Sequence, residues 1–487
     1  MAIPDNSFGE LGLAITGIGS KYPRMASSQR RSRSWLMATI LTRRRKFNLA
    51  PRASLDTPDP ILTATVYSMK KVLSINRFTG IESRSSIGTS DHPIVNKPEA
   101  PSIRELHETF MSDGVPLAIE ASRKAIAEAR IDLSEITHIV ATTCTDSANP
   151  GFDHFVAKGL GIRHQIEKVL LHGVGCSGGL AALRIAGGLA LGHTMRRKPA
   201  RILCVALEVS TTMVRSELNS INELQETRIG VCLFSDCGSA VVLSNGIGEQ
   251  KAEPVFNLLG WEHKIIADTE GDLGFDVDPV GWKVVLSPRV PQIAAESLAP
   301  TFAELMADVP NMPKEYQIPA DFDWAMHPGG ATILTGAEKA VSLTPEHMRA
   351  SYDTYMNHGN SSSATIFSVL DRLRSKEMDA LAPGGRVRDY VVGCAFGPGI
   401  SVEMCMMKRN MGGSRGLGGM QTPPETESEG SRSEGEEDTD WASVDPKESA
   451  PDTPEPETVG ARNGAVLSPP ATDDGFITEA LAGVELD

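Results

Sequence analysis

Short apolar runs alternate with amphipathic stretches along most of the chain, from about residue 61 to residue 408. The runs are either continuously apolar or rich in β-branched residues, which is typical of buried strands. The stretches between them carry apolar residues at helical spacing. Strand–helix alternation of this kind predicts right-handed crossovers and a mainly parallel or mixed sheet. The first predicted strands are 136–144, 168–174, 201–209 and 239–245, and the first predicted helices are 114–131 and 177–193.

The same alternation recurs in the second half of the chain. A strand is predicted at 321–327, a helix at 329–341, and two closing strands at 389–397 and 400–408. An apolar run that ends in a glycine turn predicts one more strand at 11–20. The simplest architecture is an α/β fold of two similar halves, each of which buries its sheet between helices.

The length of 487 residues exceeds what one small core usually organises. We expect an N-terminal half at 1–245, a C-terminal half at 246–409 and a tail at 410–487. A segment at about 21–52 interrupts the first half with ten Lys/Arg and no acidic residue. This segment is a basic interaction loop or nuclear signal, a solvated insertion, or a gene-model artefact such as a retained intron. We predict no binding of nucleic acid.

The tail is rich first in glycine and then in Glu, Ser, Pro and Thr. It has too few apolar groups to offset chain entropy, so we expect it to be disordered. Residues 421–487 hold 18 of the 62 acidic residues and three of the 47 basic ones, which accounts for the whole formal net charge of −15. The rest of the chain is neutral, so the acidity belongs to the tail.

The seven cysteines form no CxxC pair and no zinc spacing. Most of them lie inside apolar runs, as reduced intracellular thiols would. The sequence shows no secretory signal and no uninterrupted apolar run of about 18 residues that would span a bilayer. These features favour a cytoplasmic protein with no membrane span and no bound metal.

Cys176 is the cysteine whose surroundings point to chemistry. It follows a predicted buried strand and the sequence HGVG, and it precedes a helix rich in Gly, Ala and Leu. A sulfur near a helix N-terminus is favoured as an anion, because unpaired N–H groups and the helix dipole are there. A thiolate with a lowered pKa is a competent nucleophile. From this stretch alone, catalysis and simple core packing both remain open.

A nucleophilic cysteine needs an ionising partner and donors for a developing oxyanion. His327 ends a predicted strand and is followed by a Pro-Gly-Gly turn that opens a helix, which repeats the context of Cys176. Asn360 lies between Gly359 and three serines at a loop-to-helix transition. An Asn in such a place is a helix N-cap, or it presents its amide N–H to a bound carbonyl.

Four motifs then indicate a family: VLLHGVGCSGGLAALR, WAMHPGGATIL, HGNSSSATI and GCAFGPGISVE. Their order and spacing resemble those of the type III polyketide synthases, the chalcone and stilbene synthase-like family of the thiolase fold. The resemblance covers about 10–20 and 60–408, and the segments TTCTDSANPG and RFTGIESRSSI resemble the fungal branch most. It implies α-β-α-β-α layers and a homodimer.

The resemblance implies a Cys-His-Asn triad at Cys176, His327 and Asn360. Cys176, held as a thiolate by His327, would attack an acyl-CoA thioester and form an acyl-enzyme. His327 and Asn360 would donate hydrogen bonds to the thioester oxygen of malonyl-CoA and stabilise the enolate left by loss of carbon dioxide. The enolate would attack the acyl group on Cys176. Decarboxylation supplies the carbanion, so no metal or redox cofactor is implied.

Further residues carry over from the same resemblance. Phe234 matches an aromatic gatekeeper between the CoA tunnel and the cavity, although an ordinary core Phe is the alternative. Val284 occupies the place of a second gatekeeper Phe in plant members, which suggests a less constricted entrance. Basic side chains at Lys70, Lys71 and Arg77 are candidates for the CoA phosphates, or are solvated helix charges. The residues expected to line the cavity or shape its wall are Cys144, Ser210, Met213, Ser362, Phe396, Gly397 and Pro398.

The predicted function is condensation of malonyl-CoA onto an acyl-CoA starter, which is a medium- or long-chain fatty acyl group in our interpretation. Products would be alkylpyrones, alkylresorcinols or resorcylic acids. One alternative is a ketoacyl synthase III-like enzyme that uses an acyl carrier protein, and the FGPG loop argues against it. The other is an inactive homologue with an interaction role, against which the intact Cys-His-Asn set argues.

Overall fold

The computed structural model of the protein describes residues 10–23, 25–28, 60–88, 91–278, 281–309 and 311–411. Of residues 25–28 and 60–67 it describes the backbone only. All but the first two residues of the predicted tail, and most of the predicted basic insertion, lie outside the described residues. The paragraphs that follow concern the described part of the chain.

Nine strands form one sheet in the order β11-β12-β13-β8-β1-β7-β6-β4-β5. From the centre outward, the two sides repeat one pattern of two antiparallel pairings followed by a parallel one. The sides meet at β1 and β8, which pair over only three residues each. The bounds are β1 (Leu13–Lys21), β4 (His138–Thr142), β5 (Glu167–Leu171), β6 (Arg201–Val209), β7 (Asp236–Ser244), β8 (Phe256–Ile265), β11 (Asp323–Met326), β12 (Tyr390–Gly397) and β13 (Ser401–Arg409).

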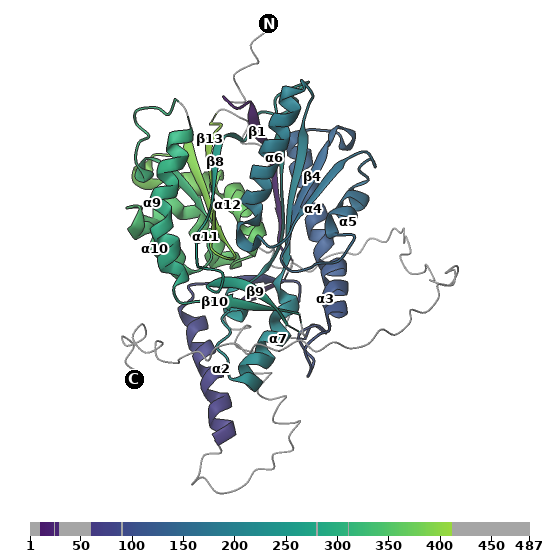
Figure 1. Cartoon of the computed structure of the whole chain (residues 1–487), viewed down its shortest axis with the longest axis vertical. Helices are drawn as coiled ribbons and strands as arrows, with labels where there is room; N and C mark the ends of the chain where they lie inside the picture. The colour runs from purple at the N-terminus through teal and green to yellow at the C-terminus, as the bar shows by residue number, and fades with distance from the viewer. Residues whose placement is uncertain are drawn as a thin grey trace, which may run out of the picture. The chain divides into compact units, whose positions relative to one another are not determined.

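Helices cover the sheet in three layers, as Figure 1 shows. Two central helices contact strands of both sides, whereas the outer helices each cover one side. This arrangement agrees with the predicted α-β-α-β-α layers. The central helices are α6 (Gly178–Met195) and α12 (Thr365–Leu373); the outer ones are α4 (Val115–Ala129) and α5 (Phe152–Leu160) on one side, and α9 (Val290–Asp308) and α10 (Ala331–Ala340) on the other.

The composition of α6 explains its place between the two sides. Its small residues let strands approach from both directions, and a Cβ at Gly187 would stand 2.7 Å from the Trp261 ring. The stretch Gly175–Met195 is long and apolar enough to cross a bilayer by length and composition. However, 61% of its window is buried inside the protein, which is the pattern of a core helix.

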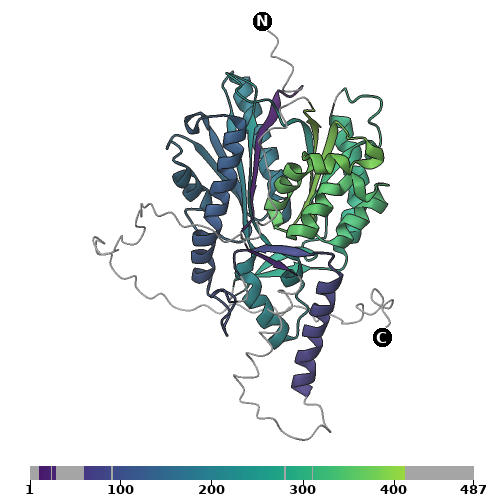
Figure 2. The ribbon, with the colours of Figure 1, turned by 180° about the vertical axis from the view of Figure 1, so that it is seen from behind.

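A group of smaller elements lies at one end of the two sides (Figures 1 and 2). Met69 and Val72 of α2 pack there against Val214 and Val231, so α2 is fixed to the fold by apolar contacts. Other short helices connect the strands. The bounds are α2 (Pro60–Phe78), α3 (Ile103–Thr109), α7 (Val214–Asn219), α8 (Gly230–Leu233), α11 (Arg349–His358), α13 (Lys376–Ala380), β2 (Met25–Ser28), β3 (Ser83–Ser86), β9 (Leu273–Asp278) and β10 (Gly281–Leu286).

The described residues of the predicted basic insertion belong to the fold. Lys21 continues β1 and pairs with Glu120, and the Tyr22 ring stacks on His358 with 3.7 Å between ring centroids. Strand β2 pairs antiparallel with β3. The structural core therefore extends further into this segment than the sequence pattern indicated.

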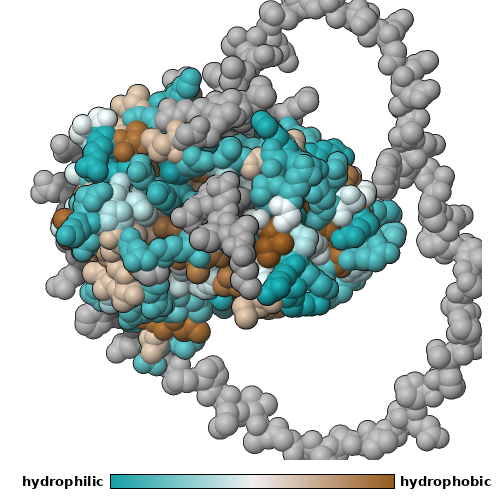
Figure 3. All heavy atoms as spheres, turned by 90° about the horizontal axis from the view of Figure 1, so that it is seen from above, coloured by the Kyte–Doolittle hydropathy of each residue, from teal (hydrophilic) through white to brown (hydrophobic). Residues whose placement is uncertain are grey.

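The surface seen from above differs from the interior in composition. Among the described residues on that face, most are hydrophilic and the hydrophobic ones form small, separate groups (Figure 3). The large buried side chains, such as Trp324, Phe367 and Phe110, lie in the clusters between the layers.

Candidate active site

Cys176 lies in a single turn of 3-10 helix, Gly175–Ser177, between the end of β5 and the start of α6. Gly175 has φ of +45°, and a Cβ there would stand 2.6 Å from Cδ of Pro398. Only glycine meets both conditions without strain, because other residues rarely adopt this backbone and would clash with the proline. The glycine before Cys176 thus lets the FGPG loop pack against the turn that carries the sulfur.

The Cys176 thiol has two side-chain hydrogen-bond partners. It donates to Oγ of Ser362 over 3.4 Å, and the side chain of Asn360 also bonds to it. Burial raises the pKa of the Cys176 thiol to about 11, although these two hydrogen bonds oppose the rise. In this arrangement the sulfur is protonated at neutral pH.

Asn360 is fixed on every side. Its backbone forms a short parallel bridge with Phe234, through Asn360 N–H to the Leu233 carbonyl and Ser235 N–H to the Asn360 carbonyl, each 2.9 Å. Its Oδ1 accepts from the Ser362 N–H at 2.8 Å, and its Nδ2 donates to the Gly329 carbonyl at 3.1 Å. The amide is therefore held in place beside Cys176 by hydrogen bonds from both of its ends.

His327 directly follows β11, where its N–H donates to the Cys394 carbonyl at 2.7 Å. The side chain is 1% exposed, and neither ring nitrogen has a hydrogen-bond partner among the described residues. Burial lowers the pKa of His327 to about 3. The ring is consequently a neutral imidazole that has one N–H to donate and one lone pair to accept.

The three predicted triad residues are connected, but not by the ion pair that the sequence led us to expect. Cys176 bonds to Asn360, and Asn360 bonds to the carbonyl of Gly329, two residues beyond His327. No hydrogen bond joins the Cys176 sulfur to the His327 ring, since both ring nitrogens are unpartnered among the described residues. Burial disfavours charge on both groups, so each is neutral in this arrangement.

Ser362 and Cys144, both expected at the cavity, lie next to Cys176. The Cys144 sulfur is 3.3 Å from Ser362 Oγ and 3.3 Å from Glu208 Oε2, to which its thiol donates. Hydrogen bonds therefore run from Cys176 through Ser362 and Cys144 to a buried carboxyl group. The sequence analysis missed Glu208, although an acid inside the apolar run RILCVALEV was a signal for it.

Glu208 is fully buried and accepts several hydrogen bonds. Thr145 Oγ1 donates to it at 3.0 Å, the Cys144 N–H donates at 3.1 Å, and the Ser363 hydroxyl also donates. Burial raises its pKa, against the effect of these donors. The carboxyl group fixes the backbone and side chains on which Cys144 and Ser362 depend.

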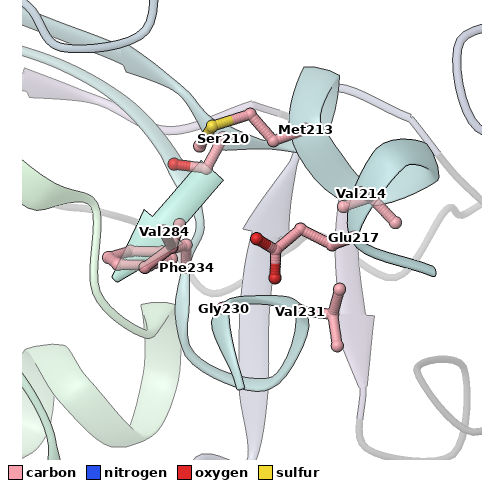
Figure 4. Close-up of a pocket in the computed structure, with 8 residues that line it drawn as sticks. All are labelled: Ser210, Met213, Val214, Glu217, Gly230, Val231, Phe234 and Val284. Atoms are coloured by element: carbon pink, nitrogen blue, oxygen red, sulfur yellow. The ribbon is translucent and has the colours of Figure 1, made fainter. Parts of the chain in front are cut away.

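A pocket lies beside this centre, and four of the predicted cavity residues line it (Figure 4). Phe234 connects the pocket with the site around Cys176, because it lines the pocket and forms the backbone bridge with Asn360. The Phe234 ring also meets Phe275 of β9 edge to face, with 6.4 Å between centroids. The pocket has about 240 Å³ of empty space, including solvent at its mouth, and is lined by Ser210, Met213, Val214, Glu217, Gly230, Val231, Phe234 and Val284.

The remaining predicted site residues lie in the core, at the turn of Cys176, or on α2. Phe396 is 4% exposed and belongs to the apolar cluster of the C-terminal side, so it packs in the core. A Cβ at Gly397 would stand 2.3 Å from Ser177 Oγ, so this glycine touches the turn of Cys176, as Pro398 does. Of the candidate CoA ligands, Lys70 and Arg77 are exposed on α2 and Lys71 is half-buried.

One set of possible metal ligands lies away from this centre. Ligand atoms of His138, Glu167 and His193 are within 4.8 Å of one another. His138 and Glu167 begin β4 and β5, whereas Cys176 follows the other end of β5. A metal bound there would have no contact with the reacting sulfur.

The comparisons with known proteins agree with this geometry. Residues 76–247 match the family model for the N-terminal domain of chalcone and stilbene synthases, and residues 258–410 match the model for the C-terminal domain. Together with the layered fold and the Cys-His-Asn centre, these matches define the class. The chain belongs to the chalcone and stilbene synthase family and has its α/β thiolase-like fold.

The relatives narrow the class further. The type III polyketide synthase pspB of Penicillium soppii is 38% identical over 415 residues, which cover 82% of this chain and 96% of the relative. A crystallographic type III pentaketide synthase from Neurospora crassa is 64% identical with a TM-score of 0.76, over 82% of this chain and 100% of that chain. The protein is accordingly a fungal type III polyketide synthase, and thus an acyltransferase.

A third relative has been crystallised with coenzyme A. The acylalkylpyrone synthase csyB of Aspergillus oryzae is 40% identical over 346 residues, which cover 70% of this chain and 86% of the relative. The structure of CsyB complexed with CoA-SH has a TM-score of 0.73 and 35% identity over 82% of this chain and 100% of that chain.

Proposed function

We propose that the enzyme condenses malonyl-CoA onto a medium- or long-chain fatty acyl-CoA starter, with Cys176 carrying the growing chain. Cyclisation would release alkylpyrone, alkylresorcinol or resorcylic acid products. The single observation that carries this proposal is the centre itself. It consists of a thiol in the turn before α6, bonded to the Asn360 amide, in a site that also holds a buried imidazole with no hydrogen-bond partner among the described residues.

The first step is acyl transfer to Cys176. Both Cys176 and His327 are neutral in the resting site, so the proton moves from sulfur to imidazole as the sulfur attacks the thioester carbonyl. The tetrahedral intermediate collapses, the carbon–sulfur bond to CoA breaks, and the imidazolium returns its proton to the departing CoA thiolate. The burial that disfavours either ion alone strengthens the attraction between the two when they form together.

The second step uses the same residues as donors. A neutral His327 has one N–H, and Asn360 has a fixed amide N–H, so both donate to the thioester oxygen of malonyl-CoA. Loss of carbon dioxide places negative charge on that oxygen, and preorganised donors in a dry site stabilise it strongly. The enolate carbon then attacks the acyl carbonyl, and the sulfur of Cys176 leaves as a thiolate, which takes up a proton from solvent water.

Three observations support the fatty starter. The pocket beside Phe234 is mostly apolar, with Met213, Val214, Val231 and Val284 in its wall. Val284 is smaller than the phenylalanine that plant members place there. Relatives include an acylalkylpyrone synthase and a pentaketide synthase.

Coenzyme A recognition is proposed for the basic residues of α2. Lys70, Lys71 and Arg77 lie on this helix, and Met69 and Val72 of the same helix pack against Val214 and Val231 of the pocket wall. Phosphates bind well to such charges at the mouth of a cavity. The CoA complex of CsyB supports a CoA site in this family.

We also propose that the enzyme acts as a homodimer in the cytoplasm. The family resemblance supports the dimer, and cysteines that are all unpaired in the described residues support a reducing compartment. Sedimentation of the purified protein measures the oligomeric state directly, and a monomer with full activity would contradict this proposal.

The function is tested by incubation with acyl-CoAs of graded length plus malonyl-CoA, with products identified by mass. We expect condensation products from medium or long fatty starters and none from the Cys176→Ala variant. Turnover of short aromatic starters only would contradict the fatty starter, and product from Cys176→Ala would contradict the mechanism. Replacing malonyl-CoA by malonyl carrier protein should give no gain in rate.

A further inference from the structure

Glu217 of α7 is an acidic residue in an otherwise mostly apolar pocket. Figure 4 shows its carboxyl group directed into the space between Phe234, Val284 and Val231. The residue is 4% exposed. Nothing in the mechanism described above uses it.

The two carboxyl oxygens of Glu217 differ in their partners. The backbone N–H of Val284 donates a hydrogen bond to the carboxyl group. Oε2 is buried and has no hydrogen-bond partner among the described residues. A Cβ at Gly230 would stand only 3.0 Å from Oε2, so the glycine backbone packs closely against this oxygen. An unpaired buried carboxyl oxygen on a residue that lines a pocket is suited to bind a polar atom of a ligand.

Burial and the donor groups that face Glu217 act on its pKa in opposite directions. Burial raises the pKa of its carboxyl group to about 7, against the nearby Arg228 and the Val284 N–H, whereas Glu226 adds to the rise. Arg228 is itself paired with Glu226, and so is Lys283 of β10. The Cys232 thiol of α8 also faces it and has a raised pKa, so it is neutral in this range.

A hydrocarbon chain would leave Oε2 unpaired, because alkyl groups neither donate nor accept hydrogen bonds. The poly-β-keto segment that grows from the starter carries carbonyl and enol oxygens at regular intervals. Its newest carbonyl is the one bound to Cys176, so the older keto oxygens, and after them the alkyl tail, lie farther from the sulfur. Phe234 links that centre to the pocket. A chain that lengthens past Phe234 therefore brings its oxygens to Glu217.

We propose that Glu217 is a specificity-determining residue that binds an oxygen of the growing poly-β-keto chain and so favours the longer ketides. The inference rests on the proposed function and names the segment of the chain that this pocket receives. A protonated carboxyl group donates its O–H to a chain carbonyl, whereas an ionised one only accepts and leaves that carbonyl without a donor.

The test compares full-length enzyme variants with one fatty acyl-CoA starter and malonyl-CoA, at about pH 6 and about pH 8, on either side of the expected titration. The readout is the ratio of longest to shortest ketide product within each reaction, which cancels changes in overall rate. Glu217→Gln keeps an N–H donor at both pH values, and Glu217→Leu has no hydrogen-bond donor at either pH. Glu223→Gln is the matched control, because Glu223 is exposed on the neighbouring helical turn.

In the wild type and in Glu223→Gln, the ratio should fall about fivefold between the lower and the higher pH, the worth of one neutral hydrogen bond. Glu217→Gln should keep the high ratio at both pH values, and Glu217→Leu should give the low ratio at both. A Glu217→Gln ratio that falls with pH as the wild-type ratio does would overturn the proposal, even if Glu217→Leu fails to fold.

A folded Glu217→Leu with the wild-type ratio at both values would also overturn it. So would a Glu217→Leu variant that accepts only shorter starters but adds the same number of ketide units, because Glu217 would then contact the alkyl tail and not a keto oxygen. Failure of the proposed function is a different result: wild-type enzyme would form no condensation product with malonyl-CoA under any of these conditions.

Discussion

Cys176 and His327 show how burial decides the resting state of a reactive pair. The thiol pKa is raised to about 11 and the imidazole pKa is lowered to about 3, so both groups are neutral. In the proposed mechanism, a neutral His327 retains the N–H that the decarboxylation step requires. The two groups would then exchange a proton during attack, and would not form an ion pair in the resting site.

Burial of His327 predicts a loss of stability in acid. A histidine whose pKa falls on folding is neutral in the folded state, whereas the unfolded chain takes up a proton below about pH 6.5. The contribution of His327 to the unfolding free energy is complete above about pH 6.5 and is lost as the pH falls toward 3. Between about pH 7 and pH 5, His327 should cost the wild type about 2 kcal/mol of unfolding free energy.

Urea unfolding of wild type and His327→Gln at both pH values measures this cost. The variant should lose about 2 kcal/mol less than the wild type on acidification. His358, whose pKa burial lowers to about 4, is present in both proteins and cancels. Equal losses in the two proteins would contradict a buried neutral imidazole at position 327.

Site residues that belong to short sequence motifs could be predicted from the sequence. Site residues whose surroundings are set by contacts with distant parts of the chain could not. Cys176, His327 and Asn360 each follow a strand or glycine turn that is visible in the sequence. Glu208 and Glu217 acquire their character from partners such as Ser363, 155 positions away, and Val284. Only the assembled fold shows that the Glu208 carboxyl group accepts several hydrogen bonds, whereas Oε2 of Glu217 has no partner among the described residues.

At the scale of elements, periodicity predicted the strands and helices that surround the site. The predicted strand 201–209 coincides with β6, and the predicted helix 114–131 contains α4. The hairpin of β9 and β10 was not predicted, because its residues are mixed in polarity and pair only with each other. That hairpin supplies Val284 and Phe275 to the pocket region, so part of the pocket could not be anticipated from the pattern.

The close packing of the turn that carries Cys176 leads to a prediction about protein stability. Gly175→Ala should destabilise the protein by about 2–4 kcal/mol, because it adds left-handed strain and a clash with Pro398. Gly173→Ala is the control: Gly173 has φ of +75° but no atom within 4 Å of a Cβ. That control should cost only about 1–2 kcal/mol.

Unfolding free energies and condensation rates of both variants test this contact. Pro398→Ala should recover part of the stability and activity lost in Gly175→Ala, since it removes the clashing ring. Equal effects of the two glycine substitutions, with no recovery from Pro398→Ala, would mean that the FGPG loop does not support the nucleophile turn.

At the scale of the whole molecule, an internal repeat brings the site together. β1-β7-β6-β4 and β8-β13-β12-β11 have the same succession of antiparallel and parallel pairings. Cys176 follows the first side, whereas His327 and Asn360 belong to the second. The sequence indicated two similar halves through repeated alternation, but the three-residue contact of β1 with β8 that joins them required the structure.

Because every site residue lies between 70 and 398, we expect a protein without residues 421–487 to retain its kcat/KM. Its formal net charge would rise from −15 to zero. A protein near zero net charge associates and precipitates more readily, so solubility near neutral pH should fall. Steady-state kinetics and a solubility curve measure both effects, and loss of condensation activity in a soluble truncated protein would assign the tail a part in catalysis.

The central claim is that Cys176 carries the acyl chain. Intact-mass spectrometry of the enzyme after incubation with a fatty acyl-CoA alone, followed by peptide mapping, tests it most directly. We predict one added acyl group per chain on Cys176, its loss in Cys176→Ala, and its retention in the neighbouring control Cys144→Ser. An acyl group on Cys144, or an acylated Cys176→Ala protein that still condenses malonyl-CoA, would contradict the account.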